Sequence, residues 1–305
     1  MSPISDAMVN NIKAYSDLFR VENSLTGLVG VVIGAVVVNG IDFTLGDVMI
    51  VSFFGLSVMF FMFSWNAYND ITDIENDRLN RPDRPLPSGK ISSGSAMIGL
   101  IIAMVLSIVF LLAGLWKLSS EGESDSILSS GIIWAAAILL LILYEGVSGM
   151  KGLKHSGLIG NFCIAVAIGM DVLFGASGLG SPADHRVLAL AGMAVSFSLA
   201  REVIKDIEDI HGDFDRITFP KKVGIENARS VAWVLTLLAL VLLFTPFLAG
   251  IFPLHHIVFV APGGFLLMLV KSKLFLEEDR AAQYLIKRAL QISMVGVIAS
   301  ACLVG

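Results

Sequence analysis

The same acidic pattern, D-I-x-D-I-x-x-D, occurs twice in this chain, at residues 70–77 and 206–213. Residues at i, i+3 and i+7 lie on one face of a helix, so each copy is expected to present three carboxylates together. Carboxylate oxygens suit Mg²⁺ or Mn²⁺, which keep several waters and commonly bridge to phosphate oxygens. Six clustered aspartates would repel one another without cations. The repeat therefore predicts a shared divalent-metal site, in preference to two solvated helix ends.

Basic residues flank both copies and predict a phosphate-bearing ligand, because guanidinium groups match phosphate oxygens geometrically. Arg81 and Arg84 are each followed by a proline that stiffens the loop. This favours phosphate binding, or pairing with the acids, over simple anchoring at the membrane. Arg201 and Lys205 lie one helical turn apart at the end of an apolar stretch, where we expect them to clamp a diphosphate.

The elements that must position these residues are membrane-spanning helices. The 305-residue chain is 55% hydrophobic and 15% charged, with a mean hydropathy of +0.81, which does not fit a soluble globular domain. A helix needs about 20 apolar residues to cross the hydrocarbon core of a bilayer, and the alternation typical of a membrane β-barrel is absent. The chain is therefore predicted to be an all-α, polytopic membrane protein with nine transmembrane helices. The spans are expected near residues 24–43, 46–68, 95–117, 130–149, 157–177, 186–205, 228–248, 251–271 and 286–304.

The distribution of basic residues orients these spans, since Lys and Arg favour the cytoplasmic side. Of the 21 basic residues, all but Lys117 and Arg186 fall on the side that holds the N-terminus. We therefore expect a multi-pass protein of the cell membrane with its N-terminus and both acidic copies in the cytoplasm and its C-terminus outside. Residues 10–20 are expected to form a short amphipathic helix on the cytoplasmic surface. No basic patch supports binding to nucleic acid.

The acidic copies and their flanks resemble the two signatures of the UbiA family of intramembrane prenyltransferases. The first signature is similar to N-D-x-x-D-x-x-x-D at residues 69–77 with N-R-P-D-R-P-L-P-S-G at 80–89, and the second to K-D-I-E-D-I-H-G-D at 205–213. Segments at residues 20–23, 153–161 and 218–224 also look like those of the family. The resemblance thus covers nearly the whole chain. It implies a single domain, residues 1–305, with nine helices around a central cavity and two pseudo-repeated halves carrying motif 1 (69–89) and motif 2 (201–224).

The resemblance implies Mg²⁺-dependent transfer of a polyprenyl group from its diphosphate to a lipophilic acceptor, with Mn²⁺ as a substitute metal. The implied metal ligands are Asn69, Asp70, Asp73, Asp77, Asp206, Asp209 and Asp213. The implied catalytic residues are Asp73, Asp77, Asp209, Asp213 and Lys205. The implied substrate-binding residues are Asn23, Asn66, Arg81, Arg84, Tyr144, Lys154, Arg201 and Lys205. Which carboxylates touch metal directly stays open, and for Asn66 and Tyr144 a helix-packing hydrogen bond is an equal alternative.

The prenyl chain needs an apolar tunnel, and six aromatic residues crowd the span that leads into motif 1. They could line the tunnel, although packing is the default role of any one of them in a chain with 19 phenylalanines. The six are Phe53, Phe54, Phe60, Phe61, Phe63 and Trp65.

The acceptor is indicated by the sequence R-E-x-x-K-D-I-E-D at residues 201–209, which is most similar to the archaeal digeranylgeranylglyceryl phosphate synthases within the family. That similarity implies geranylgeranyl diphosphate as donor and geranylgeranylglyceryl phosphate as acceptor. The segment that begins at Phe214 departs from the subgroup. A chlorophyll-synthase-like or quinone-precursor prenyltransferase therefore stays open, and a cation-coupled transporter is a more distant alternative.

Overall fold

The computed structural model describes residues 3–146, 151–210 and 217–304. Within these ranges every regular element is a helix, and nine helices are long and apolar enough to cross a membrane. The elements are α1 (Pro3–Leu18), α2 (Val21–Asn39), α3 (Leu45–Thr72), α4 (Ile74–Asn80), α5 (Ser93–Glu121), α6 (Ser124–Glu145), η1 (Leu153–His155), α7 (Leu158–Ser177), α8 (His185–Glu208), α9 (Phe219–Val223), α10 (Ile225–Leu248), η2 (Leu254–His256), α11 (Ile257–Phe275) and α12 (Asp279–Val304). The prediction of nine spans is confirmed.

The span boundaries differ from the prediction mainly where a helix begins with polar residues. The fourth span begins at Ser124 and the ninth at Asp279, several residues before the positions expected from hydropathy. The predicted separation of the seventh and eighth spans is confirmed, because α10 ends at Leu248 and Gly250 takes a φ of +75°. Glycine adopts that left-handed conformation without steric cost.

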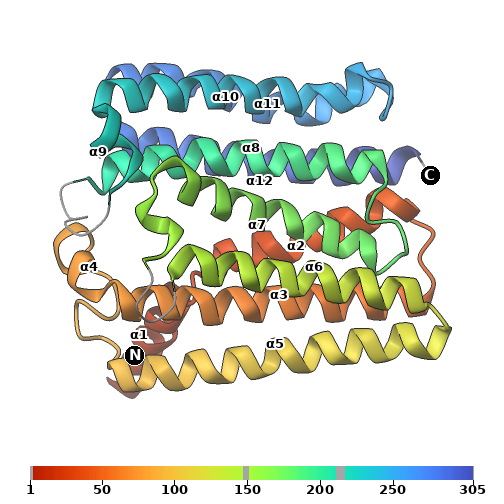
Figure 1. The fold of residues 1–305 in the computed structure, drawn as a ribbon, viewed down its shortest axis with the longest axis horizontal. Coiled ribbons are helices and arrows are strands. Elements are labelled where there is room, and N and C mark those ends of the chain that lie inside the picture. The colour runs from red at the N-terminus through yellow and green to blue at the C-terminus, as the bar shows by residue number, and fades with distance from the viewer. Residues whose placement is uncertain (1–2, 147–150, 211–216, 305) are drawn as a thin grey trace.

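The long helices run side by side, with α4, α9 and the N-terminal helix at one end of the bundle and the C-terminus at the other (Figure 1). Helix α2 packs against α3, α7 and α12, while α8 packs against α7, α10 and α12. Small residues allow these close approaches: a Cβ added to Gly175 would clash with the backbone of Val31, and one added to Gly169 would clash with Val195. Both motifs are therefore held at the same end of a tightly packed bundle.

Helix α1 is longer than predicted and forms part of the packed structure. It begins at Pro3, and its side chains Ala14 and Leu18 are buried against Ala67 and Leu86. The chain then turns sharply, since Arg20 has a φ of 46° before α2 begins at Val21. This turn brings Arg20 close to the end of α3.

The expectation that each acidic copy lies on one helix face is wrong for the first copy. Helix α3 ends at Thr72 and α4 begins at Ile74, with Asp73 between them at φ −100° and ψ 16°. The second copy leaves its helix early, because α8 ends at Glu208. Asp213 lies outside the described residues. The break in the helix thus separates Asp73, which contacts Lys154, from Asp70 and Asp77, which both contact Arg84.

Candidate functional site

A cavity of about 280 Å³ lies among α2, α3, α6, α7, α8 and α12. Its walls are mostly apolar, and its polar residues gather toward the ends of α3 and α8 that carry the motifs. Eight residues predicted to bind substrate or metal line it: Asn23, Asn66, Asn69, Arg81, Arg84, Tyr144, Arg201 and Lys205. An apolar chamber with a basic end is suited to an amphiphile that has an anionic head.

The acids of motif 1 alternate with arginines. The side chain of Asp70 is 1% exposed, and its Oδ1 lies 2.5 Å from Arg20 and 3.3 Å from Arg84. Arg84 also lies 2.5 Å from Asp77. Burial raises the pKa of Asp77, although Arg84 opposes the shift. Burial lowers the pKa of Arg84, and the nearby Arg20 lowers it further. The arrangement places mutually compensating charges in a site of low polarity.

Motif 1 and motif 2 are joined by a direct contact. Arg81 donates hydrogen bonds at 2.9 and 3.0 Å to the two carboxylate oxygens of Asp209. The neighbouring Asn80 donates to the backbone carbonyl of Asp209 at 3.2 Å. Burial lowers the pKa of Arg81, but the charge of Asp209 more than compensates, so the pKa lies above its ordinary value. This contact unites segments 128 residues apart in sequence.

The short helix η1 and helix α7 supply further partners for the acids. Lys154 lies in η1, where its Nζ is 3.3 Å from Asp73 and forms an ion pair with Glu145. Asn161 on α7 donates a hydrogen bond to Asp206 at 2.9 Å. Lys154 and Asn161 both belong to the 153–161 segment that resembles the family. Lys154 thus lies beside motif 1 but does not line the cavity, and its binding of substrate stays a prediction.

Arg201 and Lys205 share a carboxylate. Glu202 lies 3.3 Å from Arg201 and 3.2 Å from Lys205, and all three line the cavity. Asn66 lines the cavity and also donates a packing hydrogen bond to the backbone carbonyl of Phe19 at 3.1 Å, while its binding of substrate stays a prediction. Tyr144 lines the cavity from α6, with 7% of its surface exposed.

Only part of the aromatic cluster faces the cavity. Phe61 and Trp65 are among its lining residues, whereas Phe53, Phe54, Phe60 and Phe63 are not, in line with packing as the default role of a single aromatic residue. Phe54 is fully buried and stacks on Phe174, and Phe63 stacks on Phe19. A 3.6-residue period turns most of a helix away from any one cavity, so neighbouring aromatics serve helix packing.

The donor chemistry at the motif ends fits Mg²⁺. The predicted ligands supply only oxygen donors, and Asn69 Oδ1 is buried with no hydrogen-bond partner among the described residues. In those residues, no three Asp, Glu, His or Cys side chains are grouped as a preformed metal cage. Mg²⁺ usually takes one or two carboxylates and keeps water or phosphate oxygens as its other ligands, so a cage is not required. Asn69, Asp73 and Asp209 are the residues that would hold the ion.

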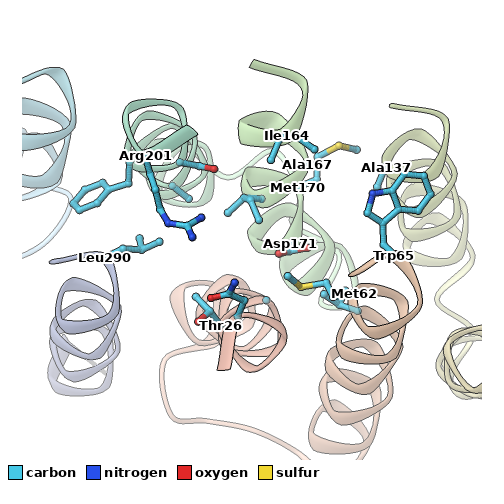
Figure 2. Close-up of a pocket in the computed structure, with 18 of the residues that line it drawn as sticks. Thr26, Met62, Trp65, Ala137, Ile164, Ala167, Met170, Asp171, Arg201 and Leu290 are labelled. Carbon is cyan, nitrogen blue, oxygen red and sulfur yellow. The ribbon is translucent and has the colours of Figure 1, made fainter. Parts of the chain in front are cut away.

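Several residues at the cavity were not predicted from the sequence. Arg20 and Asp171 line it, as do Glu202, Lys287 and Gln291. Asp171 comes from α7 and points toward α2 and α3 (Figure 2). A signal for Asp171 was present, since it is the only charged residue in the span Leu158–Ser177 and ionisable residues inside spans are often functional. Lys287 carried no such signal, because it lies near the end of its span.

Comparison with known proteins decides the family. Residues 27–294 match the model of the UbiA prenyltransferase family. The chain belongs to this family. It is therefore a membrane prenyltransferase, and membership favours the enzyme interpretation over a transporter.

Curated relatives and solved structures in the family agree with this assignment. The chain is 32% identical over 269 residues to the digeranylgeranylglyceryl phosphate synthase of Methanococcus aeolicus, covering 86% of this chain and 87% of the relative. The corresponding protein of Methanocaldococcus jannaschii is 30% identical and covers 97% of each chain. A solved structure concerning digeranylgeranylglyceryl phosphate synthase is 28% identical, with a TM-score of 0.64, and covers 96% of this chain and 99% of that one.

A UbiA homologue from Archaeoglobus fulgidus, solved with DMAPP and Mg²⁺, has the same fold at 18% identity. The TM-score is 0.62, and the match covers 95% of this chain and 99% of that one. The UbiA-like fold predicted from the sequence is thereby confirmed.

Proposed function

We propose that this prenyltransferase transfers a geranylgeranyl group from geranylgeranyl diphosphate to the free hydroxyl of geranylgeranylglyceryl phosphate. Mg²⁺ is the proposed cofactor, with Mn²⁺ as a substitute. The names of the relatives support this acceptor, as does the R-E-x-x-K-D-I-E-D sequence at residues 201–209. The contact between Arg81 and Asp209, which joins both motifs at the basic end of an apolar cavity, is the structural observation that carries the proposal.

The basic residues and the cavity walls account for the two halves of the donor. Arg81, Arg84, Lys154 and Lys205 bind the diphosphate, and the apolar walls take the prenyl chain. Mg²⁺, when bound at the motif carboxylates, neutralises charge that develops on the leaving diphosphate. Trp65 lies one helical turn before Asn69 and lines the cavity, so its ring can stabilise an allylic cation near the motifs.

The transfer exchanges one C–O bond for another. The bond from prenyl C1 to the diphosphate oxygen breaks, and its electron pair leaves with the diphosphate. The acceptor hydroxyl oxygen then bonds to C1, and its proton can pass to the released diphosphate. The apolar walls exclude water, which would otherwise capture the cation. Asp73, Asp77, Asp209, Asp213 and Lys205 are the residues we propose to act on the diphosphate during this step.

The experiment supplies the purified protein, in Mg²⁺, with geranylgeranyl diphosphate and three acceptors in parallel. The acceptors are geranylgeranylglyceryl phosphate, a chlorophyllide and an aromatic acid that serves as a quinone precursor. Mass spectrometry identifies the prenylated product. We expect the prenylated product of geranylgeranylglyceryl phosphate. If this product is absent, geranylgeranylglyceryl phosphate is rejected as the acceptor. If the chlorophyllide or the aromatic acid is prenylated instead, that compound becomes the assigned acceptor.

We also propose that the end of the bundle carrying the motifs faces the cytoplasm. The bias of basic residues supports this orientation. Ser93 and Ser120 are exposed near opposite ends of α5, so each can be changed to cysteine after Cys163 and Cys302 are replaced by alanine. In intact cells a membrane-impermeant thiol reagent should label only the Ser120→Cys variant. Labelling of Ser93→Cys alone would reverse the orientation.

A further inference from the structure

Some of the cationic side chains that line the cavity are not paired with those carboxylates of the acidic motifs that the structure describes. Among the described residues that line it are six cations and two carboxylates, Asp171 and Glu202. Three of the cations, Arg20, Arg81 and Arg84, pair with aspartates of the motifs. The other three are Arg201, Lys205 and Lys287. Lys205 directly precedes Asp206, the first aspartate of motif 2, which leaves Arg201 and Lys287 to be explained.

Arg201 is placed to bind an anion inside the cavity. Its side chain is 26% exposed and reaches from α8 toward the space between α2 and α12, beside Leu290 (Figure 2). Its Nε is buried and has no hydrogen-bond partner within the ranges described. A buried guanidinium N–H without an acceptor is costly, so it indicates a missing acceptor group.

Lys287 approaches the same cavity from α12. Its Nζ lies 2.9 Å from Glu22 Oε2, and its side chain is 23% exposed. Gln291, one helical turn further, donates to Glu22 at 3.2 Å and also lines the cavity. Glu22 thus holds a lysine and an amide in place where α12 packs against α2.

The position of these groups separates them from the diphosphate. Along α8, Arg201 precedes Lys205, which we propose to bind the diphosphate, by one turn of about 6 Å, and it precedes Asp209 by about 12 Å. Helix α12 packs against α8 and α2, whereas motif 1 extends from the end of α3. The interval leaves room for the reacting carbon and a glycerol unit between the diphosphate and a second anionic group.

We propose that Arg201 and Lys287, assisted by Gln291, bind the phosphate monoester of the acceptor. This inference rests on the proposed function, because it concerns the acceptor named there. It revises the sequence-based expectation that Arg201 clamps the diphosphate together with Lys205. Arg201 supplies a planar fork for two phosphate oxygens, and Lys287 supplies a point charge. In the free protein Glu202 and Glu22 neutralise these cations.

The test compares Arg201→Gln and Lys287→Gln with wild type in steady-state assays. Each variant should raise the KM for geranylgeranylglyceryl phosphate about 10- to 100-fold, the usual effect of losing a charged hydrogen bond, while the KM for geranylgeranyl diphosphate changes less than about twofold. Arg280→Gln is the matched control, since Arg280 also lies on α12 but its side chain is 90% exposed. Its KM values should equal those of wild type.

Two further measurements separate binding from misfolding. Lys287→Arg keeps the charge and should retain most of the acceptor affinity. Isothermal titration of metal-free protein with geranylgeranylglyceryl phosphate should detect binding to wild type and a loss of affinity in both Gln variants, whereas the unphosphorylated ether should bind all three proteins equally.

The outcomes distinguish the two proposals. If the variants raise the KM for the donor and leave the KM for the acceptor unchanged, Arg201 and Lys287 bind the diphosphate. That result would overturn this inference and leave the proposed function intact. Failure of wild type to prenylate the phosphorylated ether would reject the proposed function and this inference with it.

Discussion

Among the aspartates that the structure describes, the first one has different surroundings in the two copies of D-I-x-D-I-x-x-D. Asp70 is buried between the guanidinium groups of Arg20 and Arg84. Asp206, at the same place in the second copy, accepts a hydrogen bond from the neutral amide of Asn161. Arginines tie Asp70 to the turn before α2 and to the loop after α4, whereas the amide of Asn161 ties Asp206 to α7. The same sequence pattern is therefore held by different elements in its two copies.

The comparison continues at the later aspartates. Asp73 lies at the break between α3 and α4 and contacts Lys154, while Asp209 lies just beyond α8 and contacts Arg81. Each is thus at a helix end and faces a cation that we propose to bind the diphosphate. The two motifs converge in function at these positions.

Removing the metal should have the largest effect, since it disables both motifs together. With excess chelator we expect no product above background in the mass-spectrometric assay. Added Mg²⁺ should restore full activity, and Mn²⁺ should restore part of it. Unchanged turnover in chelator would contradict the metal mechanism.

Asp73→Asn and Asp209→Asn should reduce kcat to a similar extent, because one acts in each motif. We expect losses of at least about 10²- to 10³-fold, as when a group that stabilises the leaving charge is removed. Size-exclusion chromatography and circular dichroism should show an unchanged fold. Full activity of either variant would remove that aspartate from the site.

Asp70→Asn should destabilise the protein more than Asp206→Asn. The substitution removes the carboxylate that the partly buried Arg20 and Arg84 share. We expect it to lower the free energy of unfolding by on the order of 3 kcal/mol. Asp206 is only partly buried, and losing the hydrogen bond from Asn161 predicts a cost of less than about 1.5 kcal/mol. Thermal unfolding in detergent would measure the difference, and equal melting temperatures would show that the two aspartates have equivalent surroundings.

The smallest effect is expected at the exposed end of motif 1. Glu75 pairs with Arg78 at 2.7 Å, but these side chains are 77% and 56% exposed. Glu75→Gln should change the free energy of unfolding by less than about 1 kcal/mol, because surface ion pairs contribute little. The same thermal unfolding assay would detect it, and a large loss of stability would assign Glu75 a structural contact beyond Arg78.

The sequence predicted the membrane spans more accurately than it predicted the local geometry of the two motifs. An apolar run of about 20 residues has few alternatives in a membrane, so nine spans could be counted. The early start of α12 at Asp279 was missed because its first turns are polar. Asp279 forms an ion pair with Arg229 at 2.8 Å, which extends the helix beyond its apolar part. Hydropathy does not record such a contact.

The candidate site was predicted in its residue types and only partly in its contacts. Arg81 and Arg84 were expected to bind phosphate or pair with acids, and in the structure both pair with acids. Asn66 and Tyr144 do line the cavity, which the sequence left undecided. The sequence did not predict that Arg81 pairs with Asp209. This pairing depends on the relative positions of α3 and α8, which the helices packed between them determine.

By itself, the sequence determined the membrane class, the number of spans and the acidic and basic residue types that the two motifs contain. These follow from composition and from spacing within short segments, where local periodicity controls the outcome. The tertiary structure alone decided which charges meet. It buried Asp70 between two arginines, joined Arg81 to Asp209, and brought Arg201 and Lys287 to one cavity. Those contacts link residues far apart in sequence, so they depend on the packing of the whole bundle.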